Sequence, residues 1–136
     1  MKEVIFDRYY VEEEDFDLYN ELEENKEFVL HNHPEVFVLA VCIGYKYNLR
    51  EKLLKRKALT LKSSLQNMDY GQTIYDAFKC IATLNNEVDE NGNLRVNTLM
   101  EEYAKGGFNK LYNEILSEPS NKSDNLLNHM LLDSEL

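Results

Sequence analysis

Three short clusters in this 136-residue sequence contain residue types that do chemistry in proteins, and the first is His31-Asn32-His33 with Cys42 downstream. These side chains can ligate metal ions. However, two histidines two residues apart do not share a helix face, and no second Cys or His lies at the spacing of a zinc finger. The third histidine, His129, lies in the C-terminal tail. The spacing favours a helix start, with His33 capping and Pro34 at the first helical position, over a metal site.

The second cluster, Asp89-Glu90-Asn91-Gly92-Asn93, has the oxygen-rich composition of a calcium-binding loop. That motif requires Gly at its sixth position and a bidentate Glu at its twelfth. Counted from Asp89, those positions hold Leu94 and Met100. The spacing therefore predicts a polar turn.

The third cluster is acidic, and it runs from Glu12 to Asp15 with Asp17 close behind. Paired carboxylates act as acid and base only in a concave, desolvated setting that shifts their pKa values. Consecutive acids also suit the first turn of a helix, where the helix dipole is positive. We therefore expect these acids to be solvated at a helix start.

No other catalytic motif is present in the sequence. Gly106-Gly107 lacks the Lys-Ser/Thr of a phosphate-binding loop, and Ser63-Ser64 lacks the flanking glycines of a nucleophile elbow. We therefore predict no catalytic residue, no metal site and no cofactor. This pattern indicates an interaction protein and not an enzyme.

The charge of the chain is strongly segregated. Residues 1–30 carry a net charge of −8, residues 31–66 of +5 and residues 67–136 of −7, for a total of −10. An acidic whole disfavours non-specific binding to nucleic acid. The basic segment at residues 46–62 is the exception, and its predicted contact residues are Lys46, Arg50, Lys52, Lys55, Arg56 and Lys57. They either contact phosphates or pair with acids of helix 15–25 or of a partner, and the net charge favours the second reading.

Composition indicates a helical protein with a modest core. Hydrophobic residues make up 43% of the chain, whereas Pro and Gly number only 2 and 5. No apolar run approaches the roughly 18 residues of a membrane span, and the N-terminus lacks the layout of a signal peptide. We therefore expect a cytoplasmic protein without membrane contact. Cys42 and Cys80 fall within apolar helical patterns, which predicts buried thiols and no disulfide.

Hydrophobic periodicity predicts a mainly α fold, a compact bundle of about five helices with a short N-terminal strand or extended arm. The strand is expected at residues 3–11 and the helices at residues 15–25, 34–44, 70–85, 95–105 and 108–116. The helix at 34–44 is apolar all round and should be buried centrally. Gly44 near its end either allows close packing or starts the exit, and Gly106-Gly107 should end the helix at 95–105.

Two parts of the chain stay open at this level. Period-2 spacing at Leu59, Leu61 and Ser63 leaves residues 46–62 either helical or extended. Residues 1–116 are expected to form a single helical domain. Residues 117–136 form a tail that is either disordered or a short docking helix.

Three stretches together resemble a known family. They are Val36-Phe37-Val38-Leu39-Ala40 leading to Gly44-Tyr45-Lys46 and Leu49-Arg50, the helix from Ile74 to Leu84, and Glu101-Glu102-Tyr103-Ala104-Lys105-Gly106-Gly107-Phe108. In this order they resemble DNA phosphorothioation-associated protein 4, a family of small accessory proteins of bacterial anti-phage defence systems. The resemblance implies an accessory subunit that binds a larger ATPase or nuclease subunit acting on DNA, and it supplies no catalytic mechanism.

Two alternatives remain from the sequence. The order of strand, helix and apolar helix in the first third is similar to a ribbon-helix-helix unit, in which strands from two chains pair and read DNA. Such a unit would make the chain a homodimer and a DNA-contacting regulator, with nucleic acid reached through the basic segment. The net charge of −10 instead suggests an acidic inhibitor that mimics DNA.

Overall fold

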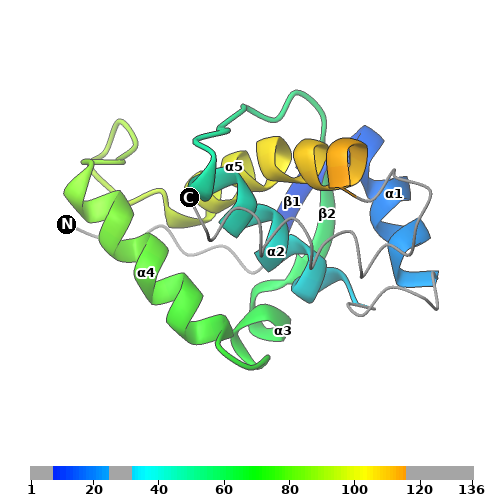
Figure 1. Cartoon of the computed structure of the whole chain (residues 1–136). Coiled ribbons are helices and arrows are strands. Elements are labelled where there is room, and N and C mark those ends of the chain that lie inside the picture. The colour runs from blue at the N-terminus through cyan, green and yellow to red at the C-terminus, as the bar shows by residue number, and fades with distance from the viewer. Residues whose placement is uncertain (1–7, 25–31, 116–136) are drawn as a thin grey trace, which may run out of the picture.

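The computed structural model describes residues 8–24 and 32–115, with side chains to residue 113 (Figure 1). These residues form five α-helices, one π-helical turn and two strands. In chain order the elements are β1 (Arg8–Glu12), α1 (Glu13–Glu24), α2 (His33–Lys46), β2 (Arg56–Leu61), α3 (Lys62–Gln66), α4 (Gly71–Leu84), α5 (Val96–Lys110) and η1 (Leu111–Ile115). The predicted mainly α fold with a short N-terminal strand is therefore confirmed. The predicted tail at 117–136 lies outside the described residues.

Helix α2 is the centre of the core, as its apolar sequence predicts. Val36, Phe37, Ala40 and Val41 are fully buried. The helix is capped by Asn32, whose side-chain oxygen accepts a hydrogen bond from the Glu35 N–H at 3.1 Å. The cap is thus one residue before the predicted His33, because Asn is a far better N-cap than His.

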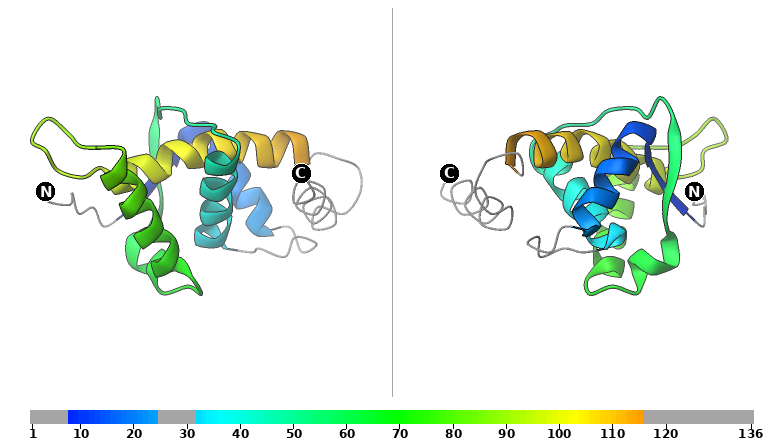
Figure 2. Two further views of the ribbon diagram at one scale, coloured as in Figure 1. Left: turned by 60° about the vertical axis from the view of Figure 1, so that its left-hand side comes forward. Right: turned by 90° about the vertical axis from the view of Figure 1, so that its right-hand side faces the viewer.

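Helices α2 and α5 cross with their backbones in contact (Figure 2). A Cβ atom added to Gly107 would lie 1.8 Å from the Ala40 carbonyl oxygen, and one added to Gly44 would lie 2.0 Å from the Tyr103 carbonyl oxygen. The close-packing reading of Gly44 is confirmed. The predicted helix end at Gly106-Gly107 is wrong, because α5 continues to Lys110 and then widens into the π-helical turn η1. Its glycines serve interhelical contact and not chain termination.

The basic segment contains a strand that the sequence left unresolved. Strand β2 pairs antiparallel with β1, from Arg8 opposite Leu61 to Glu12 opposite Arg56, with a register shift between Tyr9 and Tyr10. Residues 47–55, here named the connection, run along one side of α5 and lead from α2 to β2 (Figure 1).

This pairing corrects the ribbon-helix-helix alternative. That unit needs β1 to pair with the same strand of a second chain. In this fold β1 pairs with β2 of its own chain. On its other side, the Tyr10 N–H donates a hydrogen bond to the buried Glu101 carboxylate at 2.8 Å. Strand β1 therefore has no free edge at Tyr10 for a second chain.

Helix α4 packs on the far end of α5 from α1 (Figure 2). Its buried residues include Tyr75, Phe78 and Ala82. Cys80 lies on its exposed face, so the prediction of a buried thiol is wrong for Cys80, while Cys42 is half-buried and both thiols are free. None of the helices within residues 8–24 and 32–115 has both the length and the hydropathy that a bilayer crossing requires.

The helix crossing yields a stability prediction for Gly107→Ala. Alanine raises helix propensity by about 1 kcal/mol. We nevertheless expect a net loss of roughly 1–3 kcal/mol in the free energy of unfolding, because the new Cβ overlaps a backbone carbonyl and separates the helices. Urea denaturation measures this loss. Thr73→Ala on the exposed face of α4 is the control, and a Gly107→Ala chain as stable as wild type would contradict the contact.

Candidate functional site

Main-chain groups of the basic connection form hydrogen bonds with α5. The Glu51 N–H donates to the Glu102 carbonyl at 3.1 Å, and the Lys105 ammonium donates to the Lys52 carbonyl at 2.9 Å. At the start of the connection, the Leu49 N–H donates to the Gly44 carbonyl at 2.7 Å. The basic side chains are therefore displayed from a backbone that α5 fixes.

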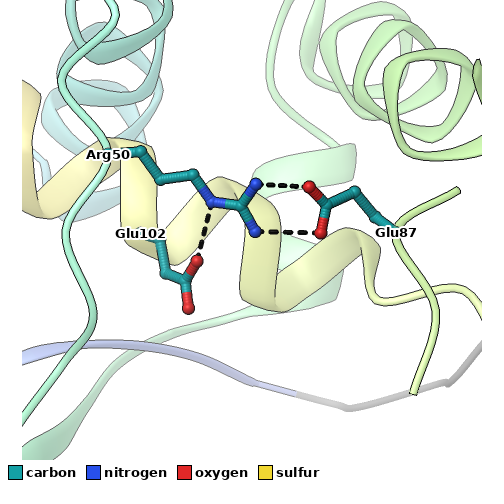
Figure 3. Close-up of polar contacts among 3 residues, drawn as sticks. All are labelled: Arg50, Glu87 and Glu102. Carbon is teal, nitrogen blue, oxygen red and sulfur yellow. Dashed lines mark hydrogen bonds and ion pairs between the residues drawn. The ribbon is translucent and has the colours of Figure 1, made fainter. Parts of the chain in front are cut away.

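Arg50 joins three segments of the chain (Figure 3). Its two terminal nitrogens bind both carboxylate oxygens of Glu87, and its Nε donates to Glu102 at 2.8 Å. The hydrogen bonds from Arg50 lower the pKa of Glu87, and those with Glu87 raise the pKa of Arg50 above its usual range. A planar guanidinium in a bidentate pair is a strong positional clamp. Arg50 thus ties the connection to α5 and to the loop before it.

Arg56 is also used within the fold. Its guanidinium donates to Glu101 at 3.1 Å and lies 4.5 Å from the centre of the Tyr10 ring. Glu101 is only 2% exposed and also accepts the Tyr10 N–H. Burial raises the pKa of Glu101 to about 7, although both donors act in the opposite direction.

The four predicted lysines remain at the surface. Lys46, Lys52, Lys55 and Lys57 are exposed, and the ammonium of Lys57 lies 5.1 Å from the centre of the Phe16 ring. The structure therefore divides the six predicted contact residues into two arginines that form ion pairs within the fold and four exposed lysines. The internal partners are acids of α5 and Glu87, and not those of helix 15–25 that the sequence suggested. The role of the lysines as a contact surface stays a prediction.

The acidic cluster is only partly solvated, which corrects the sequence-based expectation. Glu12 is buried at the end of β1, where its carboxylate accepts the N–H groups of Leu54 and Lys55 at 2.8 and 3.2 Å. Asp15 is 4% exposed, and burial, followed by the negative charges of Glu14 and Glu12, raises the pKa of Asp15 to about 6.

The other two clusters have structural partners. His33 contacts Glu23 at 3.0 Å, while His31 and His129 lie outside the described residues. The Asp89 carboxylate accepts the N–H groups of Asn91 and Asn93 at 2.9 and 3.0 Å, which confirms the predicted polar turn. Within the ranges the structure describes, no group of three His, Cys, Asp or Glu residues could hold a metal ion.

A small polar pocket lies between the connection and the start of α5. Its volume is about 250 Å³, and we name it the α5 pocket; it is lined by Lys52, Leu53, Arg56, Arg95, Thr98, Glu101 and Glu102. Sequence reasoning found Lys52 and Arg56 but missed Arg95 and Thr98. Nothing in the local sequence marks these two residues, because only the fold brings the start of α5 beside the connection.

The fold and its polar contacts define a small, mainly helical protein whose strongest ion pairs hold its own segments together. Residues 8–135 match the family described as DNA sulphur modification system-associated protein 4, and the chain belongs to that family. Curated proteins and solved structures yield no match.

The motif that carried the family resemblance has a structural role. Glu101 and Glu102 bind Arg56 and Arg50, and the Tyr103 ring packs edge-on against Tyr45. Lys105 and the two glycines that follow it contact the connection and α2. The motif therefore identifies how this fold is held together, and it does not by itself mark a catalytic site.

The clamp geometry predicts that Arg50→Lys destabilises the fold by about 1–2 kcal/mol, because a lysine cannot reproduce the bidentate pair with Glu87. A double-mutant cycle with Glu87→Gln in urea denaturation measures the coupling between the two side chains. Arg95→Lys is the matched control, because Arg95 forms no ion pair in the described part of the chain. Equal effects of the two arginine substitutions would contradict the clamp.

The buried acids predict the direction of a pH dependence. A carboxyl whose pKa is raised on folding binds its proton more tightly in the folded state. The stabilisation of the folded state by Glu101 is therefore fully present below the ordinary pKa of 4.5. It is lost as the pH rises through about 7. Asp15 acts in the same direction, between 3.8 and about 6. The pKa of Glu87 is lowered, so its stabilisation of the folded state is present above pH 4.5 and is lost as the pH falls below that value.

We therefore expect these two acids to lower the free energy of unfolding between about pH 5 and about pH 8, and Glu101→Gln to reduce that decrease. Urea denaturation at both ends of the range measures it. Glu90→Gln in the exposed turn is the control. A carboxyl NMR titration that assigns Glu101 an ordinary pKa would contradict the prediction.

Proposed function

We propose that this protein is a non-catalytic accessory subunit that binds a larger protein component of a DNA sulphur modification system in the cytoplasm. The observation that carries the proposal is membership of a family described as associated with such a system. The larger component would be the ATPase or nuclease subunit of an anti-phage complex. The accessory role consists of docking and not of bond chemistry.

The distribution of charge supports a protein partner with an acidic surface. Lys52, Lys55 and Lys57 are exposed on or beside the connection, while the chain as a whole carries −10. Opposite charges steer association and select partners more than they add affinity. An acidic patch on the larger subunit would complement these lysines, whereas the remaining acidic surface would repel it.

The structure favours this role over the DNA-mimic alternative. A mimic needs exposed acids in phosphate-like rows. Glu12, Asp15, Glu101 and Glu102 are instead buried, and Glu87 is held by Arg50. These acids are therefore unavailable to imitate a DNA strand.

The docking proposal predicts that Lys55→Glu weakens binding to the larger subunit. We expect an affinity loss of roughly tenfold, or about 1.4 kcal/mol, because the reversed charge faces an acidic surface. Co-expression of the tagged chain with each system component, followed by pull-down and titration, measures the loss. Lys79→Glu on the exposed face of α4 makes the same charge change away from the connection.

Two results would count against the proposal in different ways. A chain that co-purifies with none of the components would sink the accessory role itself. Binding weakened equally by Lys55→Glu and Lys79→Glu would retain the accessory role and reject the lysines as the docking surface.

A further inference from the structure

Three cationic side chains from three different segments converge on the α5 pocket. Lys52 comes from the connection, Arg56 from β2, and Arg95 from the residue directly before α5. Within the part of the chain described, the Lys52 ammonium and the Arg95 guanidinium form no hydrogen bond and no ion pair. Hydrogen bonds lower the pKa values of Glu87 and Asp89, and the positive charge of Arg95 lowers them further. The pocket lining thus includes two cationic residues whose side-chain donors form no hydrogen bond within the described residues.

The two carboxylates in the pocket lining are engaged by other donors. Glu101 accepts the Tyr10 N–H and Arg56, and Glu102 accepts the Nε of Arg50. Both carboxylates therefore already accept hydrogen bonds from donors of the fold. They do not supply a partner for either Lys52 or Arg95, although both line the same space.

The start of α5 adds to the positive character of the pocket. Helix α5 begins at Val96 without a side-chain cap, since Arg95 at the cap position makes no capping hydrogen bond. The first turn of a helix presents unpaired N–H groups and the positive end of the helix dipole. Thr98 lies in this turn and is one of the residues that line the pocket. The start of α5 and Thr98 therefore add to an anion site whose main feature is the set of cationic residues in its lining.

We propose that the α5 pocket binds a single phosphate group, with Lys52 and Arg95 as its principal ligands and Thr98 as a further donor. Together these side chains offer more donors than the two oxygens of a carboxylate would use, whereas a tetrahedral oxyanion accepts from several directions. A pocket of about 250 Å³ is smaller than a typical site for a whole small molecule. It therefore accommodates one group of a larger ligand. This inference does not depend on the accessory role.

The experiment titrates the ¹⁵N-labelled full chain with inorganic phosphate at low ionic strength and follows its backbone amide signals. We expect saturable shifts at residues 52–53 and 95–98, which flank the pocket. Lys52→Gln and Arg95→Gln should each weaken phosphate binding about tenfold, since each removes one charge-assisted contact. Lys55→Gln is the matched control, because it removes the same charge from the same connection outside the pocket, and it should change binding less than about twofold.

A second arm separates two sources of the phosphate. A short DNA duplex, with and without one phosphorothioate linkage, is titrated into the same chain. Shifts of the same amides, lost in Lys52→Gln and Arg95→Gln, identify a nucleic-acid backbone as the source, and a difference between the duplexes identifies recognition of sulphur. Shifts with inorganic phosphate alone identify a free or terminal phosphate group.

The proposal is overturned if neither phosphate nor duplex gives saturable shifts at these amides. It is also overturned if Lys55→Gln weakens binding as much as Lys52→Gln, because binding would then follow net charge and not the pocket. Both results concern the isolated chain. They are therefore independent of the co-purification that tests the accessory role.

Discussion

The contact between the backbones of α2 and α5 is the constraint on which the rest of the structure depends. It exists because Gly44 and Gly107 lack a Cβ atom where each helix meets the other's carbonyl groups. The close crossing buries Ala40 and the face of α5 that carries Met100 and Ala104. It also fixes the polar face of α5 beside the connection and the two strands. A wider crossing would leave these segments without their anchors.

Buried carboxylates accept backbone hydrogen bonds that neighbouring strands would accept in a larger sheet. A two-stranded ribbon leaves backbone N–H groups that must find acceptors when they are buried. Glu101 accepts such a group from Tyr10, and Glu12 accepts two from the connection. Glu102 holds the connection through Arg50. Burying acids in this way has a cost, which appears in the raised pKa of Glu101.

The separation of structural from available charges bears directly on function. Arg50 and Arg56 stabilise the fold through ion pairs, whereas the side chains of Lys52 and Arg95 form no hydrogen bond and no ion pair within the described residues. Arg50 and the two acids Glu101 and Glu102, which belong to the stretches that carry the family resemblance, are part of these ion pairs. Part of the sequence by which the chain resembles the DNA sulphur modification system-associated protein 4 family thus holds this fold together. Differences in partner or ligand are to be sought at Lys52 and Arg95.

The sequence by itself determined the helical class, the family and the positions of most helices, because these follow from local periodicity, caps and short motifs. It also located the basic segment, since charge is visible in the sequence. The tertiary structure alone decided that residues 56–61 form a strand, because their partner is β1, more than forty positions earlier. It likewise turned the glycines of α5 from an expected helix end into a helix contact, and it buried Glu12 and Asp15. Arg95 joined Lys52 in one pocket for the same physical reason: long-range packing places side chains together that no local pattern connects.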